Sequence, residues 1–125
     1  MRYTSKAYTY FSISGKNFDT QDFVNLIQIT PTKVGENRLG EKFWEYKIEA
    51  TDSDQDLDKA IEKLIQIFNP KSNEIQAYAS QKGLYIKIFV VIQSKNNEDN
   101  GVFLNRNFIK FLGDMGAEIE IDIYN

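Results

Sequence analysis

An amphipathic helix in the middle of the chain constrains the fold most strongly. Between Ser53 and Pro70, apolar side chains recur at the spacing of one helical face, namely Leu57, Ala60, Ile61, Leu64, Ile65 and Phe68. Ser53 is a suitable N-cap, and Asn69-Pro70 ends the periodic run. A stripe of this width has to be buried, so the helix must pack against a second layer.

Four segments show the alternation of β-strands and can supply that layer. They are residues 8–14, 43–50, 84–93 and 116–125. The segment 84–93, LYIKIFVVIQ, is apolar on both faces, and we expect it in the interior of the sheet. The segment 43–50, FWEYKIEA, carries alternating charges on one face, as edge strands do.

Three further helices are expected between these strands. One begins after the N-cap Asp19, one runs from Ser72 to Gly83, and one lies between the N-cap Asn105 and the C-terminal Gly116. Residues 30–42 are expected to form a long loop. The loop contains G-x-x-x-x-G, but Glu41-Lys42 follows instead of the Lys-Ser or Lys-Thr of a phosphate-binding loop.

The order strand-helix-strand-helix-helix-strand-helix-strand predicts an α+β fold. We expect a two-layer sandwich, with a four-stranded, mainly antiparallel sheet and three to four helices on one face. A length of 125 residues favours a single domain over 1–125.

Composition excludes several kinds of chemistry. The chain has neither Cys nor His, so thiolate catalysis, His-based catalysis and ordinary zinc sites are excluded, and we expect no cofactor, no metal and no catalytic residues. A formal charge of -3 disfavours nucleic acid as a partner. No stretch approaches the roughly 20 apolar residues of a membrane span, so we expect a cytoplasmic protein without membrane contact.

The chain resembles a family known as domain of unknown function 4279. The residues that carry the resemblance are YTYFSISG in the first strand, IQITPTKVGE after the first helix, Trp44 in the second strand and FLGDMGAEIEIDIYN at the C-terminus. The resemblance covers nearly the whole chain. It implies that the family's recurring positions fall on Pro31, Thr32, Gly35, Trp44, Gly116, Asp122 and Tyr124, but it implies no activity and no catalytic residues.

The final strand places three carboxylates on one face. Glu118, Glu120 and Asp122 alternate with isoleucines, so their side chains point to the same side of the sheet. The row is a solvated sheet face with Lys47 or Lys87 as cross-strand partners, a surface that docks another molecule, or a site of carboxylate chemistry. Asp122 is the member expected to accept backbone hydrogen bonds near the neighbouring loop.

Tyrosines join these carboxylates on the face of the sheet that the helices leave free. The candidate binding residues are Tyr8, Tyr10, Tyr85, Lys87, Glu118, Glu120, Asp122 and Tyr124. Tyrosines among acids suit a protein-binding surface, but the 30–42 loop or a second copy of the chain is an alternative cover for this face.

The leading hypothesis is a non-enzymatic protein-binding module, monomeric or homodimeric, with a basic protein partner. Its concrete form is an immunity-type inhibitor of a basic toxin domain. The alternative is a small-ligand-sensing domain or a carboxylate-dependent enzyme, which a polar pocket between the loops 30–42 and 94–101 would favour.

Overall fold

The computed structural model describes residues 6–50, 54–93 and 103–124. Its strands are β1 (Lys6–Gly15), β2 (Lys33–Glu36), β3 (Lys42–Ala50), β4 (Tyr85–Gln93) and β5 (Glu118–Tyr124). Its helices are α1 (Thr20–Ile27), α2 (Asp54–Phe68), the short 3-10 helix η1 (Asn69–Lys71), α3 (Ser72–Lys82) and α4 (Arg106–Met115).

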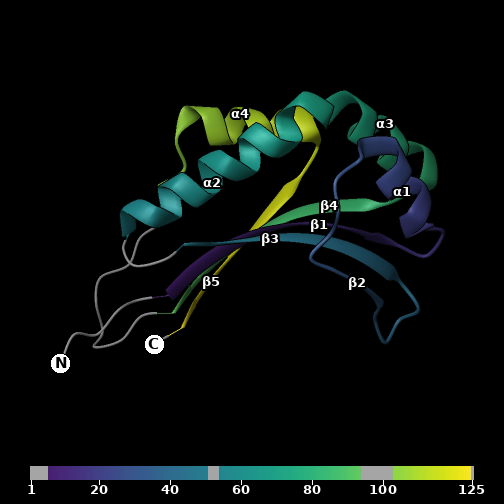
Figure 1. The fold of residues 1–125 in the computed structure, drawn as a ribbon, viewed down its shortest axis with the longest axis horizontal. Helices are drawn as coiled ribbons and strands as arrows, with labels where there is room; N and C mark the ends of the chain where they lie inside the picture. The colour runs from purple at the N-terminus through teal and green to yellow at the C-terminus, as the bar shows by residue number, and fades with distance from the viewer. Residues whose placement is uncertain (1–5, 51–53, 94–102, 125) are drawn as a thin grey trace.

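The expected α+β architecture is confirmed, with the helices packed on one face of a single open sheet (Figure 1). The sheet has five strands in the order β2-β3-β1-β4-β5, so the prediction of four strands was wrong. Pairing is antiparallel except between β4 and β5, which are parallel. The parallel pair follows from α4, because a helix between two strands carries the chain back to the end where the first strand began.

The additional strand, β2, lies in the segment that the sequence predicts to be a loop. Thr32 anchors it, since its backbone N–H and its hydroxyl donate to the carbonyl oxygen of Glu45 over 2.8 and 3.1 Å. Gly35 lies opposite Phe43, and a Cβ at position 35 would come within 2.7 Å of the Phe43 ring. The Phe43 ring therefore lies against β2 at Gly35, where the absence of a side chain leaves room for it.

β2 pairs only with residues 42–45 of β3, so this half of the strand is interior. Residues 46–50 have no described strand on that side and form an edge, as the charges of β3 suggest. Lys33 of β2 lies opposite Glu45 of β3, so one of the charged positions has a neighbour of opposite charge on the adjacent strand. The segment 84–93 is confirmed as an interior strand, with β1 on one side and β5 on the other.

The predicted helix ends agree with the structure where it describes them. The Asp19 carboxylate accepts hydrogen bonds from the N–H groups of Gln21 and Asp22, and Asn105 caps α4 through the N–H of Phe108. Gly116 ends α4 with a φ of 68°, in the left-handed region that favours glycine. The predicted cap Ser53 lies outside the described residues.

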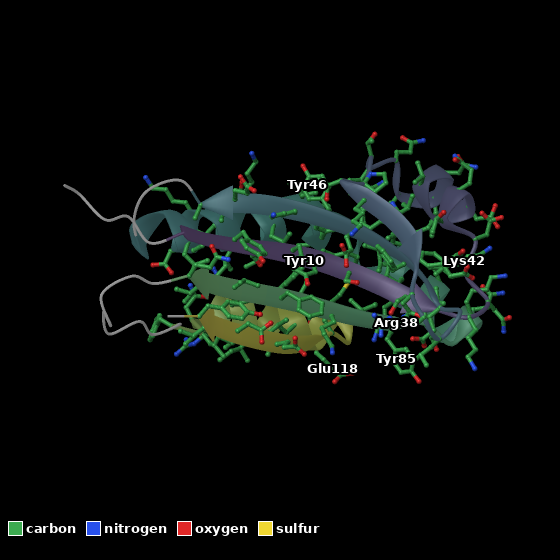
Figure 2. The ribbon with its side chains drawn as sticks, turned by 90° about the horizontal axis from the view of Figure 1, so that it is seen from below. Tyr10, Arg38, Lys42, Tyr46, Tyr85 and Glu118 are labelled. Carbon is green, nitrogen blue, oxygen red and sulfur yellow. The ribbon has the colours of Figure 1, made fainter. Side chains whose placement is uncertain are left out.

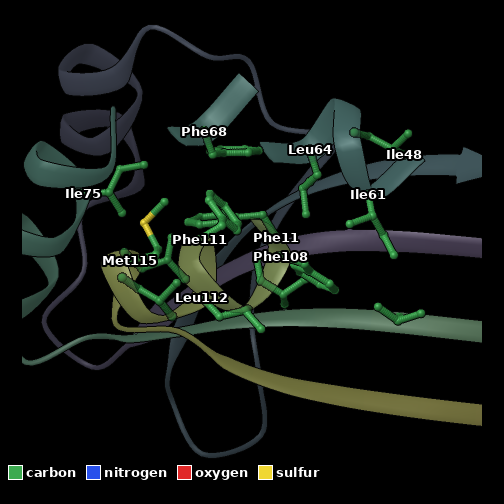
Figure 3. Packing of buried hydrophobic residues seen from close by; sticks show 14 of the residues in the cluster. Phe11, Ile48, Ile61, Leu64, Phe68, Ile75, Phe108, Phe111, Leu112 and Met115 are labelled. Carbon is green, nitrogen blue, oxygen red and sulfur yellow. The ribbon is translucent and has the colours of Figure 1, made fainter. Parts of the chain in front are cut away.

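The core fills the space between the helices and the sheet (Figure 3). Trp44 is fully buried there, as its strand pattern predicts, and the rings of Phe11, Phe23 and Phe68 stand nearly perpendicular to its indole. The Trp44 Nε1–H has no hydrogen-bond acceptor among the described residues.

Candidate functional site

The face of the sheet opposite the helices, here called the outer face, is built by strand alternation. The register places its side chains in rows that cross the strands. One row runs Lys47, Tyr10, Phe89, Glu120, and its neighbour runs Glu49, Tyr8, Val91, Asp122. Figure 2 shows this face from below, with no helix of the described residues in front of it.

Three rings form an aromatic row on the outer face, consisting of Tyr8, Tyr10 and Phe89. Tyr10 stacks on Phe89 with ring centroids 4.4 Å apart and an interplanar angle of 12°, and on Tyr8 at 6.2 Å and 20°. Lysines lie over both ends of the row, with Lys47 Nζ 4.2 Å from the centre of the Tyr8 ring and Lys87 Nζ 5.4 Å from that of Phe89. Stacking and cation–π contacts hold these rings in one orientation.

The environment of Tyr10 keeps its hydroxyl protonated. Burial raises the pKa of Tyr10 well above its ordinary value, and the negative charges of Glu45, Glu120 and Asp122 act in the same direction. The phenol therefore stays neutral, with a hydrogen that it can donate to an acceptor on a partner.

Glu118, Glu120 and Asp122 of β5, here called the acidic strip, border the aromatic row. Glu118 and Glu120 are exposed, and Asp122 is half-buried. Glu120 pairs with Lys87 across the parallel strands at 3.5 Å, so the prediction of Lys87 as a cross-strand partner is confirmed. Lys47, the other predicted partner, pairs with Glu49 on its own strand at 3.3 Å.

Among the described residues the Asp122 carboxylate accepts no hydrogen bond, and the adjoining segment 94–102 is outside that description. Both ion pairs on the face are substantially exposed, and such pairs contribute little to stability. The acidic strip is therefore not explained by a stabilising role.

The candidate residues do not form one tight cluster. Tyr8, Tyr10, Lys87, Glu120 and Asp122 occupy adjacent rows in the middle of the face. Tyr85 and Tyr124, 61% and 54% exposed, stand near opposite ends of the sheet. Strand alternation places Phe89 on the same face, but Phe89 was not predicted as a binding residue. It completes the aromatic row because the register between β1 and β4 aligns it with Tyr10.

A hollow lies at one end of the outer face, and Glu41 of the turn after β2 is among its lining residues. Figure 1 shows this turn projecting below the sheet. The volume of the hollow is about 270 Å³, and its lining residues are Ser12, Ser14, Glu41, Tyr85, Lys87, Phe89 and Glu118. The Ser12 side chain is only 7% exposed and makes no hydrogen bond to any residue in the described part of the chain. The predicted pocket towards 94–101 cannot be placed, because that segment lies outside the description.

A second hollow, of about 480 Å³, lies on the helix layer between η1, α3 and α4, and holds none of the candidate residues. Over the ranges that the structure describes, no three acidic side chains are grouped so that they could hold a metal ion. In the same ranges, no helix has the length and apolar character needed to cross a membrane.

Comparison with known proteins gives a family but no characterised relative. Searches among curated proteins and among solved structures found no match. A family model described as Domain of unknown function (DUF4279) matches residues 5–125, as the resemblance predicted. The chain therefore belongs to the DUF4279 family.

Proposed function

We propose that this protein is a non-enzymatic binding module whose outer sheet face docks a protein with a basic surface. The observation that carries the proposal is the combination of a fixed aromatic row and an acidic strip on a face that the helices leave free. Tyrosine supplies contact area at a small entropic cost, and aromatic residues are enriched where protein interfaces are fully buried.

The charge of the face selects the partner. The register places Glu45, Glu49, Glu118, Glu120 and Asp122 on the outer face against Lys33, Lys47 and Lys87. The acids are concentrated towards β5, while all three lysines lie over aromatic rings. An excess of negative charge steers a basic surface into contact and disfavours an acidic one.

The concrete form of this proposal is a cytoplasmic inhibitor that neutralises a basic toxin domain. Such an inhibitor needs a rigid, acidic surface and no catalytic groups. The chain has neither His nor Cys, and the carboxylates of the strip all come from one strand.

The hollow beside Ser12 provides one observation in favour of the alternative, a small-ligand-sensing domain. Its serine hydroxyls and Tyr85 could hydrogen-bond a polar molecule. It is only partly enclosed, however, whereas ligand pockets typically enclose most of their ligand. A partner side chain seated there would fit the docking proposal equally well.

Affinity capture from the native cell with three baits tests the docking proposal. The baits are the wild type, the sheet variant Glu118→Lys with Glu120→Lys, and the control Glu62→Lys with Glu74→Lys. The control changes the net charge equally, but its exposed positions are on α2 and α3. Thermal melts establish first that all three proteins are folded.

We expect a basic protein that the wild type and the control retain and the sheet variant loses. Its purified complex should associate more slowly as salt increases, because screening weakens electrostatic steering. A partner that the sheet variant retains with unchanged association at low salt, or the absence of any partner that distinguishes the sheet variant from the control, would contradict the proposal.

A further inference from the structure

The two edges of the sheet differ in how well they are protected. β2 has only four residues, and one of them is Gly35. β5 has seven residues, EIEIDIY, with no Pro, Gly or Lys among them. Residues 46–50 of β3, which continue the edge formed by β2, include Lys47. Short strands, prolines and charged side chains, lysines above all, are the usual means of blocking an edge. β5 has only its acids for this purpose, so it is the more open edge.

The free side of β5 presents backbone groups that can pair. Within the part of the chain that the structure describes, β5 hydrogen-bonds to β4 on one side only and is the last strand of the sheet. No described residue outside this pairing donates to or accepts from the backbone of 118–124. Such a row of N–H and C=O groups is the template on which an extended peptide adds as another strand.

The side chains of β5 specify what an added strand should carry. On the inner face, Ile121 and Ile123 are 38% and 48% exposed, although their neighbours on β4, Val90 and Ile92, are buried. On the outer face stand Glu118, Glu120 and Asp122. A strand beside β5 would therefore be stabilised by apolar side chains on the inner face and basic side chains on the outer face.

A second copy of the chain does not meet this requirement. In an antiparallel pair of two β5 strands centred on Ile121, Glu120 of each copy would face Asp122 of the other. Centring the pair on Glu120 would place two Glu120 side chains opposite each other. Cross-strand neighbours on one face are roughly 4.5–5.5 Å apart at Cβ, and like charges placed there are destabilising.

We propose that the free edge of β5 accepts an extended segment of a different protein, in which basic and apolar residues alternate, as a sixth strand of the sheet. The inference rests on the proposed function and deepens it, because it gives the basic partner a strand-forming segment. The segment places its basic side chains against the acidic strip and its apolar side chains against Ile121 and Ile123. Backbone hydrogen bonds to β5 fix its direction and register.

A synthetic peptide of about seven residues, the usual length of a strand, tests the inference directly. The peptide alternates Lys and Val, and a peptide of the same composition with its lysines in one block is the control for charge. Two further versions carry N-methyl groups, either on the Lys amides or on the Val amides. Alternate amides of a strand point to opposite edges, so only one methylated version loses the hydrogen bonds to β5.

We expect the alternating peptide to bind at least about tenfold more tightly than the block peptide, and one methylated version to bind much more weakly than the other. Binding should slow hydrogen exchange at β5 amides. Ile121→Lys should weaken binding, whereas Ile109→Lys, an equal charge change at an exposed site on α4, should not.

Equal binding of the alternating and block peptides, or equal effects of the two methylations, would overturn the inference. So would a stable dimer of the free protein in which β5 amides are protected from hydrogen exchange and which Ile121→Lys dissociates, because β5 would then pair with itself. If a captured partner is lost by the Glu118→Lys, Glu120→Lys variant but is insensitive to Ile121→Lys, the docking proposal stands and strand addition is wrong. If the captured partner is insensitive to both variants, the docking proposal fails as well.

Discussion

The packing between α2 and the sheet allows the loss of unfolding free energy in Leu64→Ala to be predicted. Leu64 is fully buried in the middle of the apolar stripe of α2. Figure 3 shows it pointing from α2 towards the sheet, near Phe11, Ile61 and Phe68. The substitution removes three carbon atoms from a site without water access.

Two effects add in the free energy of unfolding. Removing three buried carbons costs ~2.4 kcal/mol in lost burial at ~0.8 kcal/mol for each, and the cavity left behind costs more, in proportion to its residual volume. Phe11 and Phe68 stack with centroids 4.3 Å apart, and Phe68 also contacts Trp44 and Tyr46, so these rings have little freedom to close the gap. We therefore expect a loss in the upper part of the ~2–5 kcal/mol range for such substitutions.

Urea denaturation of Leu64→Ala and of the control Leu26→Ala measures this loss. Leu26 lies on α1 and is 40% exposed, so the same chemical change there should cost less than ~1 kcal/mol. The denaturant slope should be the same for both variants, because their unfolded chains expose similar surface. A cost below ~1 kcal/mol for Leu64→Ala, or equal costs for the two variants, would show that the stripe of α2 is not in the core.

Two further predictions concern ionisation and metals. Burial raises the pKa of Glu45, and the positive charge of Lys33 opposes this shift only in part. The folded state therefore binds the Glu45 proton more tightly than the unfolded chain does. The resulting stability is present in acid and is lost as the pH rises through the folded pKa. We expect Glu45→Gln to raise the melting temperature near pH 7 and to change it little below about pH 4, and an effect that is independent of pH would contradict this reasoning. We also expect thermal melts with and without EDTA to coincide, because the chain has no His or Cys ligands and its apolar elements close a core, whereas a fall of several degrees with chelator would reveal a structural metal.

Local signals in the sequence predicted much of the fold, because each depends on neighbouring residues. The side chains of Asp19 and Asn105 accept hydrogen bonds from amides within three positions of themselves. Gly116 adopts the left-handed conformation that ends α4. Strand alternation likewise assigned Tyr8, Tyr10, Lys87 and the acidic strip to one face, since the two faces of a strand follow from its own sequence.

Features that depend on pairing between distant segments were missed. β2 is a four-residue segment without clear alternation, and Thr32 and Phe43 hold it through contacts with β3. The order of the strands has no local signal, so the pairing of β2 with residues 42–45 of β3 was not predicted. The aromatic row required the alignment of Tyr10 with Phe89, which the individual strands do not encode.

If a partner occupies the open edge of β5 as proposed, the charges of this strand explain how the edge avoids self-association. An edge with apolar residues on one face and no proline is prone to pair with its own copies. The acidic strip opposes that pairing while attracting a basic strand, so the same three carboxylates would exclude one occupant and select the other. Salt then acts in opposite directions on the two associations, because screening weakens the attraction of a basic partner and also the repulsion between copies. If the acidic strip served solubility only, its charges would not act on strand pairing. Salt would then not weaken partner binding while strengthening self-association.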